Sequence, residues 1–277
     1  MSVKIIADSS CDLWELEGVN YETVPLTIMA GDKEFVDNPE NDLAGMLRFF
    51  ETYNGTSSTA CPGVEQWMKS FEDADILYVL TLSKEVSGTY NSAVLAKELF
   101  LEEHPEVKIH VFDTLTTGPE MRLMAEYVAK LVKEGKNFEE VIELTTKYRE
   151  KTNLFFAFKS IHNLAQNGRV NKVVAQAVGI MGISILGERS KEGTVEAKDK
   201  CRGEKKVLAK LMDYLKGVKY NGGKVDIAHV ENEAMAQKVA DLIKAQYPDA
   251  EISIYPAKGL ISYYAEAGGV LFACENE

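Results

Sequence analysis

Cysteine and histidine are scarce in this chain, with 4 of each among 277 residues. The cysteines stand at positions 11, 61, 201 and 274, and no two of them have the spacing of a Cys-x-x-Cys pair or of paired metal ligands. This predicts neither a zinc site nor a disulfide framework, and it is typical of a reducing, cytoplasmic setting. Motifs for phosphate-binding loops, dinucleotide binding, zinc proteases and the nucleophile elbow of serine hydrolases are also absent. We therefore expect no metal and no cofactor.

A membrane-spanning segment is missing too. The longest stretch without charge, Val173 to Gly187, contains Gln176 and three glycines and is shorter than the roughly 20 residues that cross a bilayer. The apolar run at Val3–Ala7 is too short for the core of a signal peptide and lacks its basic flank. We expect a cytoplasmic protein with no stable membrane insertion.

Positive charge is in deficit. The chain has 31 lysines and arginines against 43 acidic residues, a net charge of −12 and an isoelectric point near 5.0. Such a molecule repels polyanions, so we expect no nucleic-acid partner. Residues 1–150 carry 13 basic and 28 acidic side chains, a net charge of −15, whereas residues 151–277 carry 18 and 15, a net charge of +3. Either an anionic ligand or acidic partner is drawn to the second half, or the asymmetry is a chance distribution of solvated charge.

The composition that remains is that of a folded globular protein. Hydrophobic residues make up 45% and charged residues 27% of the chain, which excludes a disordered, collagen-like or coiled-coil protein. At roughly 150 residues per domain, a chain of this length favours two domains. We expect two lobes with a ligand site between or inside them.

Short apolar runs alternate with helix patterns in the first half. We predict buried strands at Lys4–Ala7, Val24–Met29, Ile76–Leu82 and Lys108–Asp113. We predict helices at Asp42–Thr52, Val64–Glu72, Tyr90–Glu103, Glu120–Gly135 and Asn137–Lys151. This alternation indicates an α/β domain over residues 1–152 with a parallel sheet, whose ligands bind beyond the carboxyl ends of the strands.

Residues 153–277 have the pattern of an α+β domain. We predict strands at Phe155–Phe158, Ile183–Arg189, Thr194–Cys201, Lys224–Val230, Glu251–Pro256 and Gly269–Cys274. We predict helices near Lys159–Asn167, Lys205–Gly217 and Glu233–Gln246. The second and third of these strands flank a polar turn that contains Gly193, which makes them the clearest hairpin of the chain.

Hydroxyl side chains follow the predicted strands at the edge where ligands are expected. Asp8-Ser9-Ser10-Cys11-Asp12 comes after the first strand, and Ser83 with Ser87-Gly88-Thr89 comes after the third. Thr56-Ser57-Ser58-Thr59 precedes Cys61-Pro62-Gly63, where a helix is expected to start. Hydroxyls and free N–H groups that converge there bind a carboxylate or a phosphate, although each group taken singly also suits a plain helix cap.

Cationic and titratable side chains supply further candidates in the second half. Asn167-Gly168-Arg169-Val170 ends a predicted helix just before the charge-free stretch, so we expect Arg169 at the mouth of an apolar region, near Lys172. A guanidinium there pairs with an anionic head group, or it only complements a helix C-terminus. His229 ends a predicted strand and is the histidine best placed to meet a ligand.

Several of these segments, in this order, resemble the bacterial DegV family of fatty-acid-binding proteins. Asp8-Ser9-Ser10-Cys11-Asp12-Leu13 is similar to the family's D-S-x-x-D-L, and the segment from Ser83 to Ala93 contains a match to its S-G-T-Y-x-S-A. The other matching segments are Val24-Pro25-Leu26, Gly31 to Asp37, Val111-Phe112-Asp113-Thr114 with Gly118, Gly168-Arg169-Val170, and Ala228-His229-Val230-Glu231-Asn232. Ordered matches along most of a chain are far more specific than any single motif.

The resemblance implies two lobes with a buried tunnel for one long-chain, palmitate-like fatty acid. It implies a carrier rather than an enzyme, which presents the carboxylate to a separate fatty acid kinase that phosphorylates it with ATP. Carried over by motif, the residues that contact the carboxylate are Ser58 or Thr59, Ser87, Gly88 and Thr89, with Arg169 at the entrance. Lys172 is expected beside Arg169, where the partner docks, and Ser9 and His229 are further candidates for contact.

Two segments depart from the family pattern. Ser57-Ser58-Thr59-Ala60-Cys61 stands where the family has T-S-Q-P-S, and the segment from Tyr264 to Gly269 stands where it has His-x-Gly-x-Gly. The late histidine of the family has no counterpart, and Tyr263 or Tyr264 offers a phenol instead. The alternative from another class is a hydrolase with Ser87 or Ser9 as nucleophile, for which His229 is the histidine placed to act as base.

Overall fold

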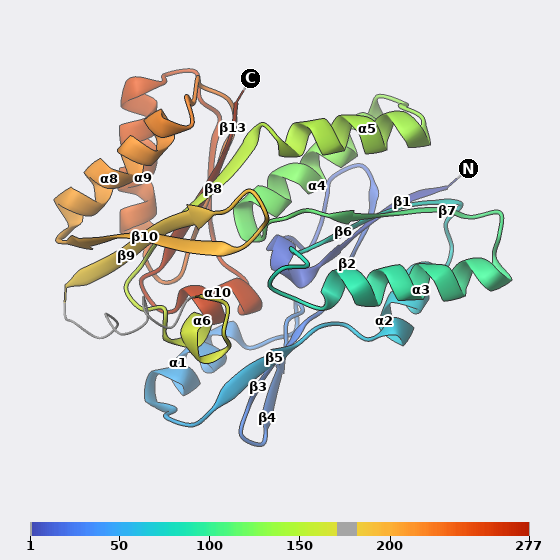
Figure 1. Ribbon diagram of the computed structural model, residues 1–277, viewed down its shortest axis with the longest axis horizontal. Helices are drawn as coiled ribbons and strands as arrows, with labels where there is room; N and C mark the ends of the chain where they lie inside the picture. Colours follow the sequence, from blue (N-terminus) through green and yellow to red (C-terminus); the bar gives the residue numbers. More distant parts are fainter. Residues whose placement is uncertain (1, 171–181, 277) are drawn as a thin grey trace.

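The first lobe is built on a parallel sheet that is covered on both faces (Figure 1). In the computed structural model, which describes residues 2–170 and 182–276, the strands lie in the order β2 (Asn20–Val24), β1 (Val3–Asp8), β6 (Ile76–Thr81) and β7 (Lys108–Asp113). Helices α2 (Val64–Ser70) and α3 (Thr89–Glu103) pack on one face, and α4 (Gly118–Lys133) and α5 (Phe138–Arg149) pack on the other. Burial on both faces explains the unbroken apolar runs, and the predicted α/β lobe is confirmed.

A small antiparallel sheet extends from this lobe. Its strands lie in the order β4 (Lys33–Val36), β3 (Thr27–Ala30) and β5 (Ser57–Ala60), with α1 (Leu43–Thr52) between β4 and β5 in the chain. The prediction of one strand over Val24–Met29 is wrong, because β2 and β3 belong to different sheets. Pro25 stands between them and has no N–H to donate to a ladder. Strands β4 and β5 have 4 residues each and lack the alternating apolar pattern by which strands are predicted.

The second lobe contains a mixed sheet of six strands. In spatial order they are β10 (Val195–Arg202), β9 (Ile183–Arg189), β8 (Thr152–Phe158), β13 (Val270–Glu275), β11 (Val225–His229) and β12 (Ile252–Pro256). Only β11 and β12 among these neighbours pair in parallel, and the predicted hairpin is confirmed as β9 and β10. The expected α+β character of this half is therefore confirmed.

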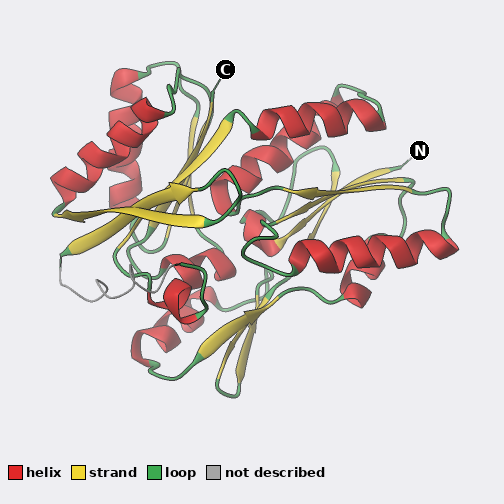
Figure 2. Cartoon of the chain, viewed as in Figure 1, coloured by secondary structure: helices red, strands yellow, loops and turns green. Residues whose placement is uncertain are grey.

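Helices cover both faces of the second sheet (Figure 2). On the outer face lie α8 (Glu204–Gly217) and α9 (Glu233–Gln246), and the inner face turns toward α4, α6 (His162–Gln166) and α10 (Gly259–Ala265). Helix α6 is shorter than the predicted Lys159–Asn167. Helix α10 is not predicted, because every residue in it except Tyr264 is buried and the segment has no amphipathic period.

The largest apolar core crosses from one lobe to the other. Ile5 of β1 and Met124 of α4 belong to the same core as Phe156 of β8 and Leu271 of β13. The lobes share this core, and the predicted division at residue 152 stays a prediction. Among the described residues, no helix combines the length and apolar character that crossing a bilayer requires.

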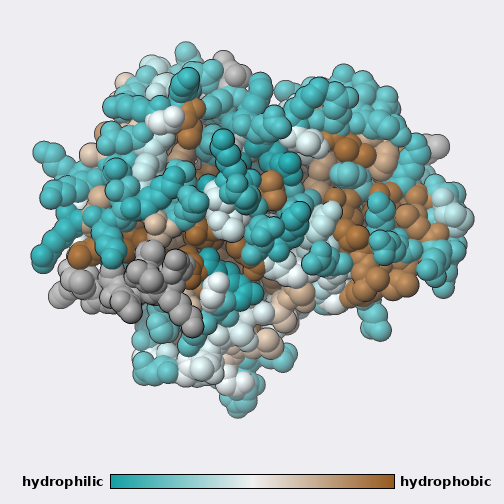
Figure 3. Space-filling view, in the orientation of Figure 1, coloured by the Kyte–Doolittle hydropathy of each residue, from teal (hydrophilic) through white to brown (hydrophobic). Residues whose placement is uncertain are grey.

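The surface in the view of Figure 3 is largely hydrophilic. Its main apolar area lies over α3, where Leu95 is 47% and Leu99 is 39% exposed. A single exposed leucine is ordinary on a soluble protein, but these two stand one helical turn apart on the same face. Helix α3 therefore has apolar residues both toward the sheet and toward solvent.

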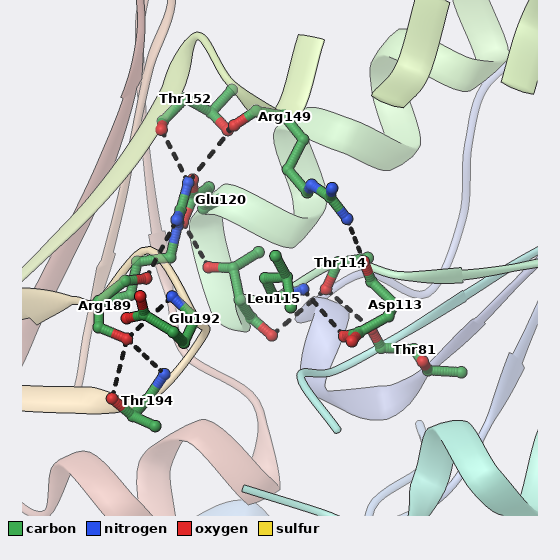
Figure 4. A network of polar contacts seen from close by, with 12 residues as sticks. Thr81, Asp113, Thr114, Leu115, Glu120, Arg149, Thr152, Arg189, Glu192 and Thr194 are labelled. Carbon is green, nitrogen blue, oxygen red and sulfur yellow. Dashed lines mark hydrogen bonds and ion pairs between the residues drawn. The ribbon is translucent and has the colours of Figure 1, made fainter. Parts of the chain in front are cut away.

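A buried ion pair joins the lobes beside the shared core (Figure 4). The fully buried Glu120 carboxylate of α4 accepts hydrogen bonds from Arg189 Nε at 2.6 and 2.8 Å, and it also accepts one from the Thr116 hydroxyl. Arg189 stands at the end of β9 and donates to the Thr152 carbonyl at 3.0 Å. Gly193, in the turn that follows, has a φ of +92°, and a Cβ there would lie 2.3 Å from Ser83 Oγ. The hairpin turn is thus held against the first lobe.

Three buried aspartates lie near one another where the lobes meet. Burial raises the pKa of Asp12 to about 8, and it raises the pKa values of Asp8 and Asp37 to about 6. Hydrogen bonds from backbone N–H groups oppose these shifts without cancelling them. At neutral pH the Asp12 side chain is a carboxylic acid, and its Oδ2 atom has no protein partner within the described chain.

We expect Glu120→Gln to lower the free energy of unfolding by about 3 kcal/mol, because the amide leaves the Arg189 guanidinium buried without its counter-ion. Denaturant unfolding followed by circular dichroism measures the change. Glu143→Gln is the matched control, since Glu143 pairs with Lys147 on α5 where both side chains are 65% exposed. Exposed pairs contribute little, so an equal loss in the two variants would contradict the role of the buried pair.

We expect stability to fall as the pH rises from 6.5 to 8, because folded Asp12, with a pKa of about 8, keeps a proton that the unfolded chain has released. His110, whose pKa burial lowers to about 4, opposes this trend weakly, because its unfolded imidazole loses a proton near pH 6.5, whereas Asp226, whose pKa burial raises to about 7, adds to it. Asp12→Asn retains the Oδ1 acceptor and removes the titration of this group, so it makes the pH dependence less steep. Denaturant unfolding of both proteins at several pH values tests this; parallel curves would be the contrary result.

Candidate ligand-binding cavity

A cavity lies between the lobes, beyond the carboxyl ends of β6 and β7. The space open to the centre of a water molecule amounts to about 90 Å³. Its apolar lining comes from both lobes and includes Leu26, Leu82, Val86, Leu154, Phe156, Phe158, Leu164, Val195, Leu260, Ile261, Ala265 and Leu271. Its polar and charged lining consists of Thr59, Ser83, Ser87, Thr116, Thr117, Arg169, Glu188, Arg189, Thr194 and Tyr264. The position agrees with the rule for ligands of parallel sheets.

The alternation of side chains along β5 determines which of its hydroxyl groups reach the cavity. Side chains alternate along a strand, so Ser57 and Thr59 face α10 while Ser58 is exposed on the other side. Thr59 Oγ1 lies 2.8 Å from Tyr264 Oη, and both residues line the cavity. Of the two alternatives left by the sequence, Thr59 is thus the residue at the cavity, and Ser58 points away from it.

Tyr263 and Tyr264 occupy different surroundings on α10. Tyr263 Oη lies 2.7 Å from Ser57 Oγ and accepts from Asn167 Nδ2 at 2.9 Å, so its phenol is held within the protein. Tyr264 faces the cavity. Burial raises the pKa of both phenols, and both therefore keep their protons at neutral pH. Tyr264 is the residue that stands at the cavity with an O–H group.

The loop between β6 and α3 contributes Ser87. Ser87 Oγ lies 2.8 Å from Thr89 Oγ1 and accepts from the Thr89 backbone N–H at 3.2 Å. Ser87 lines the cavity, the Thr89 side chain is fully buried behind it, and Gly88 is exposed at the start of α3. The structure thus brings Ser87 to the cavity with Thr89 as its support.

Arg169 follows α6 and also lines the cavity. Its Nε atom donates to the Val86 carbonyl at 3.0 Å, and its Nη1 atom donates to the Asn167 carbonyl. These bonds hold a positive charge next to the loop that contains Ser87. Lys172 and the part of the charge-free stretch before Gly182 lie outside the described residues.

Ser9 and His229 lie elsewhere in the fold. Ser9 is fully buried and its Oγ accepts from the Leu26 backbone N–H at 3.1 Å. The Nδ1 atom of His229 accepts from the Asn232 N–H at 3.4 Å, and burial lowers its pKa. Within the described part of the chain, neither residue lines the cavity. Their roles as carboxylate contacts stay predictions that the geometry does not bring together with Thr59 and Ser87.

The hydrolase alternative needs a base within reach of Ser87. All of the histidines belong to the described part of the chain, and none of them lines the cavity. The hydroxyl partner of Ser87 is Thr89, which is no base at neutral pH. Among residues 2–170 and 182–276, no group of histidines, cysteines and carboxylates could hold a metal ion. The lining beside Ser87 thus offers hydroxyl groups and the Arg169 guanidinium, but no histidine.

Sequence reasoning did not single out Thr116, Thr117, Thr194 or Arg189, which also line the cavity. A signal for the first two was available, because they follow strand β7 just as Ser83 follows β6. Thr194 and Arg189 belong to the hairpin of the second lobe, and their place against the first lobe follows from tertiary packing alone.

Known proteins that match this chain share its fold and its length. A family model described as "Uncharacterised protein, DegV family" matches residues 2–275. A DegV domain-containing protein of Streptococcus gordonii is 39% identical over 279 aligned residues, which cover 99% of each chain.

Two crystal structures superpose on this chain over 100% of both chains with a TM-score of 0.97. One is a DegV family protein from Eubacterium eligens loaded with heptadecanoic acid, at 48% identity. The other is the Streptococcus pneumoniae Fatty Acid Kinase (Fak) B3 protein loaded with linoleic acid, at 39% identity. The resemblance drawn from the motifs is confirmed, and the chain belongs to the DegV family.

Proposed function

We propose that this chain binds one long-chain fatty acid in the cavity between its lobes and presents the carboxylate to a separate fatty acid kinase. The observation that carries the proposal is the combination of a mainly apolar cavity with the hydroxyls of Thr59, Tyr264 and Ser87 in its wall. The fatty acids in the relatives from E. eligens and S. pneumoniae support the ligand class, and the kinase in the name of the pneumococcal protein supports the partner.

The acyl chain supplies most of the affinity. Burying about sixteen carbons at about 0.8 kcal/mol per methylene contributes on the order of 10 kcal/mol. Leu154, Phe156 and Leu271 offer the chain only carbon surfaces. Because binding also loses translational freedom and orders the ligand, the head group must be fully hydrogen-bonded and needs no strong ionic attraction in addition.

The hydroxyl pairs leave donors for a carboxylate. Thr59 and Tyr264 have one O–H proton each, and their mutual hydrogen bond uses one of the two. The second proton is free to point at a ligand oxygen, and the same holds for Ser87 and Thr89. In this function the Tyr264 phenol acts in place of the late histidine of the family. The Arg169 guanidinium adds a positive charge near Ser87.

The chain acts as a carrier in this proposal, and the kinase supplies the reaction. A carboxylate oxygen attacks the terminal phosphorus of ATP, ADP leaves, and an acyl phosphate forms. A carboxylate needs no base to make it a nucleophile, which suits a site that offers donors and a cation. Arg169 and Lys172 are proposed to serve docking of the kinase and exposure of the head group more than burial of the chain.

We expect Thr59→Val and Tyr264→Phe each to raise the dissociation constant for a long-chain fatty acid by about 5- to 100-fold. Losing one hydrogen bond to a buried carboxylate costs about 1–3 kcal/mol. Ser58→Ala is the matched control from the opposite side of β5, and we expect no change. Titration calorimetry gives the constants, and native mass spectrometry gives the lipid occupancy. Wild-type affinity in both cavity variants would mean that the carboxylate binds at another site.

We expect Arg169→Ala to keep bound fatty acid within a few-fold of wild type but to slow acyl phosphate formation sharply when a cognate kinase and ATP are added. The methylenes provide most of the affinity, whereas the guanidinium acts at the head group and the partner surface. Arg48→Ala, at an exposed position on α1, is the control for a lost surface charge. An empty cavity in Arg169→Ala with intact kinase association would make Arg169 a carboxylate partner instead.

A further inference from the structure

The first turn of α10 is held by two carboxyl groups of the first lobe. Asp12 Oδ1 accepts the backbone N–H of Lys258 at 2.6 Å. Asp37 Oδ1 accepts the N–H of Gly259 at 2.8 Å, and Asp37 Oδ2 accepts that of Leu260 at 3.0 Å. The first N–H groups of a helix have no partners inside the helix, so the first lobe completes the hydrogen bonding of this one.

These contacts restrict the positions of both aspartates and of the start of α10. Asp12 and Asp37 are fully buried, and a hydrogen bond from the Ser9 hydroxyl lowers the pKa of the Asp37 carboxyl. A Cβ atom on Gly259 would lie 2.5 Å from Asp37 Oδ1, so glycine is needed for the close approach. Two oxygens of one carboxyl bonded to two successive N–H groups fix the direction of the helix as well as its position.

Helix α10 carries cavity residues from this fixed turn to its last one. Leu260, Ile261 and Tyr264 all line the cavity. Tyr264 lies 2.8 Å from Thr59, so the last turn of α10 meets β5. The helix has 7 residues, which span roughly 10 Å at 1.5 Å per residue. A short, rigid segment therefore connects the Asp37 carboxyl to the Tyr264 phenol.

We propose that Asp37, assisted by Asp12, is a positioning residue for the ligand: its two carboxyl oxygens orient α10 and thereby place the Tyr264 phenol against Thr59 at the cavity. The inference rests on the proposed function for its effect on fatty acid affinity, because there Tyr264 donates to the carboxylate. Asp37 is outside the cavity lining given above and acts only through the helix. Buried Ser9, which hydrogen-bonds Asp37, then supports this positioning indirectly.

Fluorine NMR with 3-fluorotyrosine at position 264 tests the placement directly and needs no lipid. Asp37→Asn replaces one acceptor oxygen by an NH2 group that cannot accept, and we expect it to shift and broaden the resonance. Asp42→Asn is the matched control, because Asp42 accepts the Gly45 N–H at 2.9 Å at the start of α1 and bonds no group of α10. A resonance in Asp37→Asn that keeps the wild-type position and width would overturn the inference.

A double-mutant cycle tests whether Asp37 affects fatty acid binding through Tyr264. We expect Asp37→Asn to weaken fatty acid binding about tenfold in the wild-type chain but about twofold or less when Tyr264→Phe is already present, because residues that act through one group are not additive. A merely structural role for Asp37 predicts the same loss in both backgrounds, and that result would refute positioning through Tyr264.

Gly259→Ala disturbs the contact between Asp37 and α10 from the helix rather than from the aspartate. It replaces Asp37→Asn if that variant does not fold. Its methyl group displaces the Asp37 oxygen, so we expect the same change of the fluorine resonance and the same dependence on Tyr264. If the wild-type chain bound no fatty acid at all, the proposed function would fail, while the fluorine measurement would still decide whether Asp37 positions Tyr264.

Discussion

Helix α4 packs against both sheets at once, and this shared packing joins the two lobes. Met121, Met124, Ala125 and Val128 are buried along it, in the core that also contains Phe156 of the second lobe. An apolar inner face on the second sheet has to be covered, and burial against α4 and α10 removes it from water. The helix begins at Gly118, directly after Thr117 of the cavity lining. The cavity is enclosed by α10, by the loops after β6 and β7, and by β8 and the β9–β10 hairpin of the second sheet.

Polar groups in this junction are paired across the lobes. Glu120 meets Arg189, Asp37 meets the start of α10, and Thr59 meets Tyr264. A buried polar group without a partner is unfavourable, so each pair penalises any other docking of the lobes. The apolar core provides most of the energy that joins the lobes, and these pairs define the relative position in which the cavity has its shape.

In the proposed function, Tyr264 in place of the histidine of the family pattern changes the chemistry at the head group. An imidazole titrates around neutral pH, so its number of donors depends on the conditions. Burial raises the pKa of Tyr264, whose phenol keeps one proton throughout the physiological range. In the proposed function the donor opposite the carboxylate is therefore neutral, and Arg169 is a source of positive charge in the lining, while Arg189 is paired with Glu120.

The sequence alone determined the features that depend on local pattern. Apolar runs mark the strands that are buried on both faces, the turn at Gly193 marks the hairpin, and Ser87 is expected beyond the carboxyl end of its strand because the carboxyl ends of parallel strands lie at one edge of the sheet.

Tertiary structure decided what depends on distant partners. Ser58 and Thr59 are neighbours of similar chemistry, and only the pairing of β5 with β3 and its contact with α10 turn Thr59 inward. Helix α10 has no amphipathic period because partners from both lobes bury it, and the partner of Glu120 is an arginine of the other lobe. Periodicity describes which side chains share a face, whereas the packing of remote segments determines which face is inside.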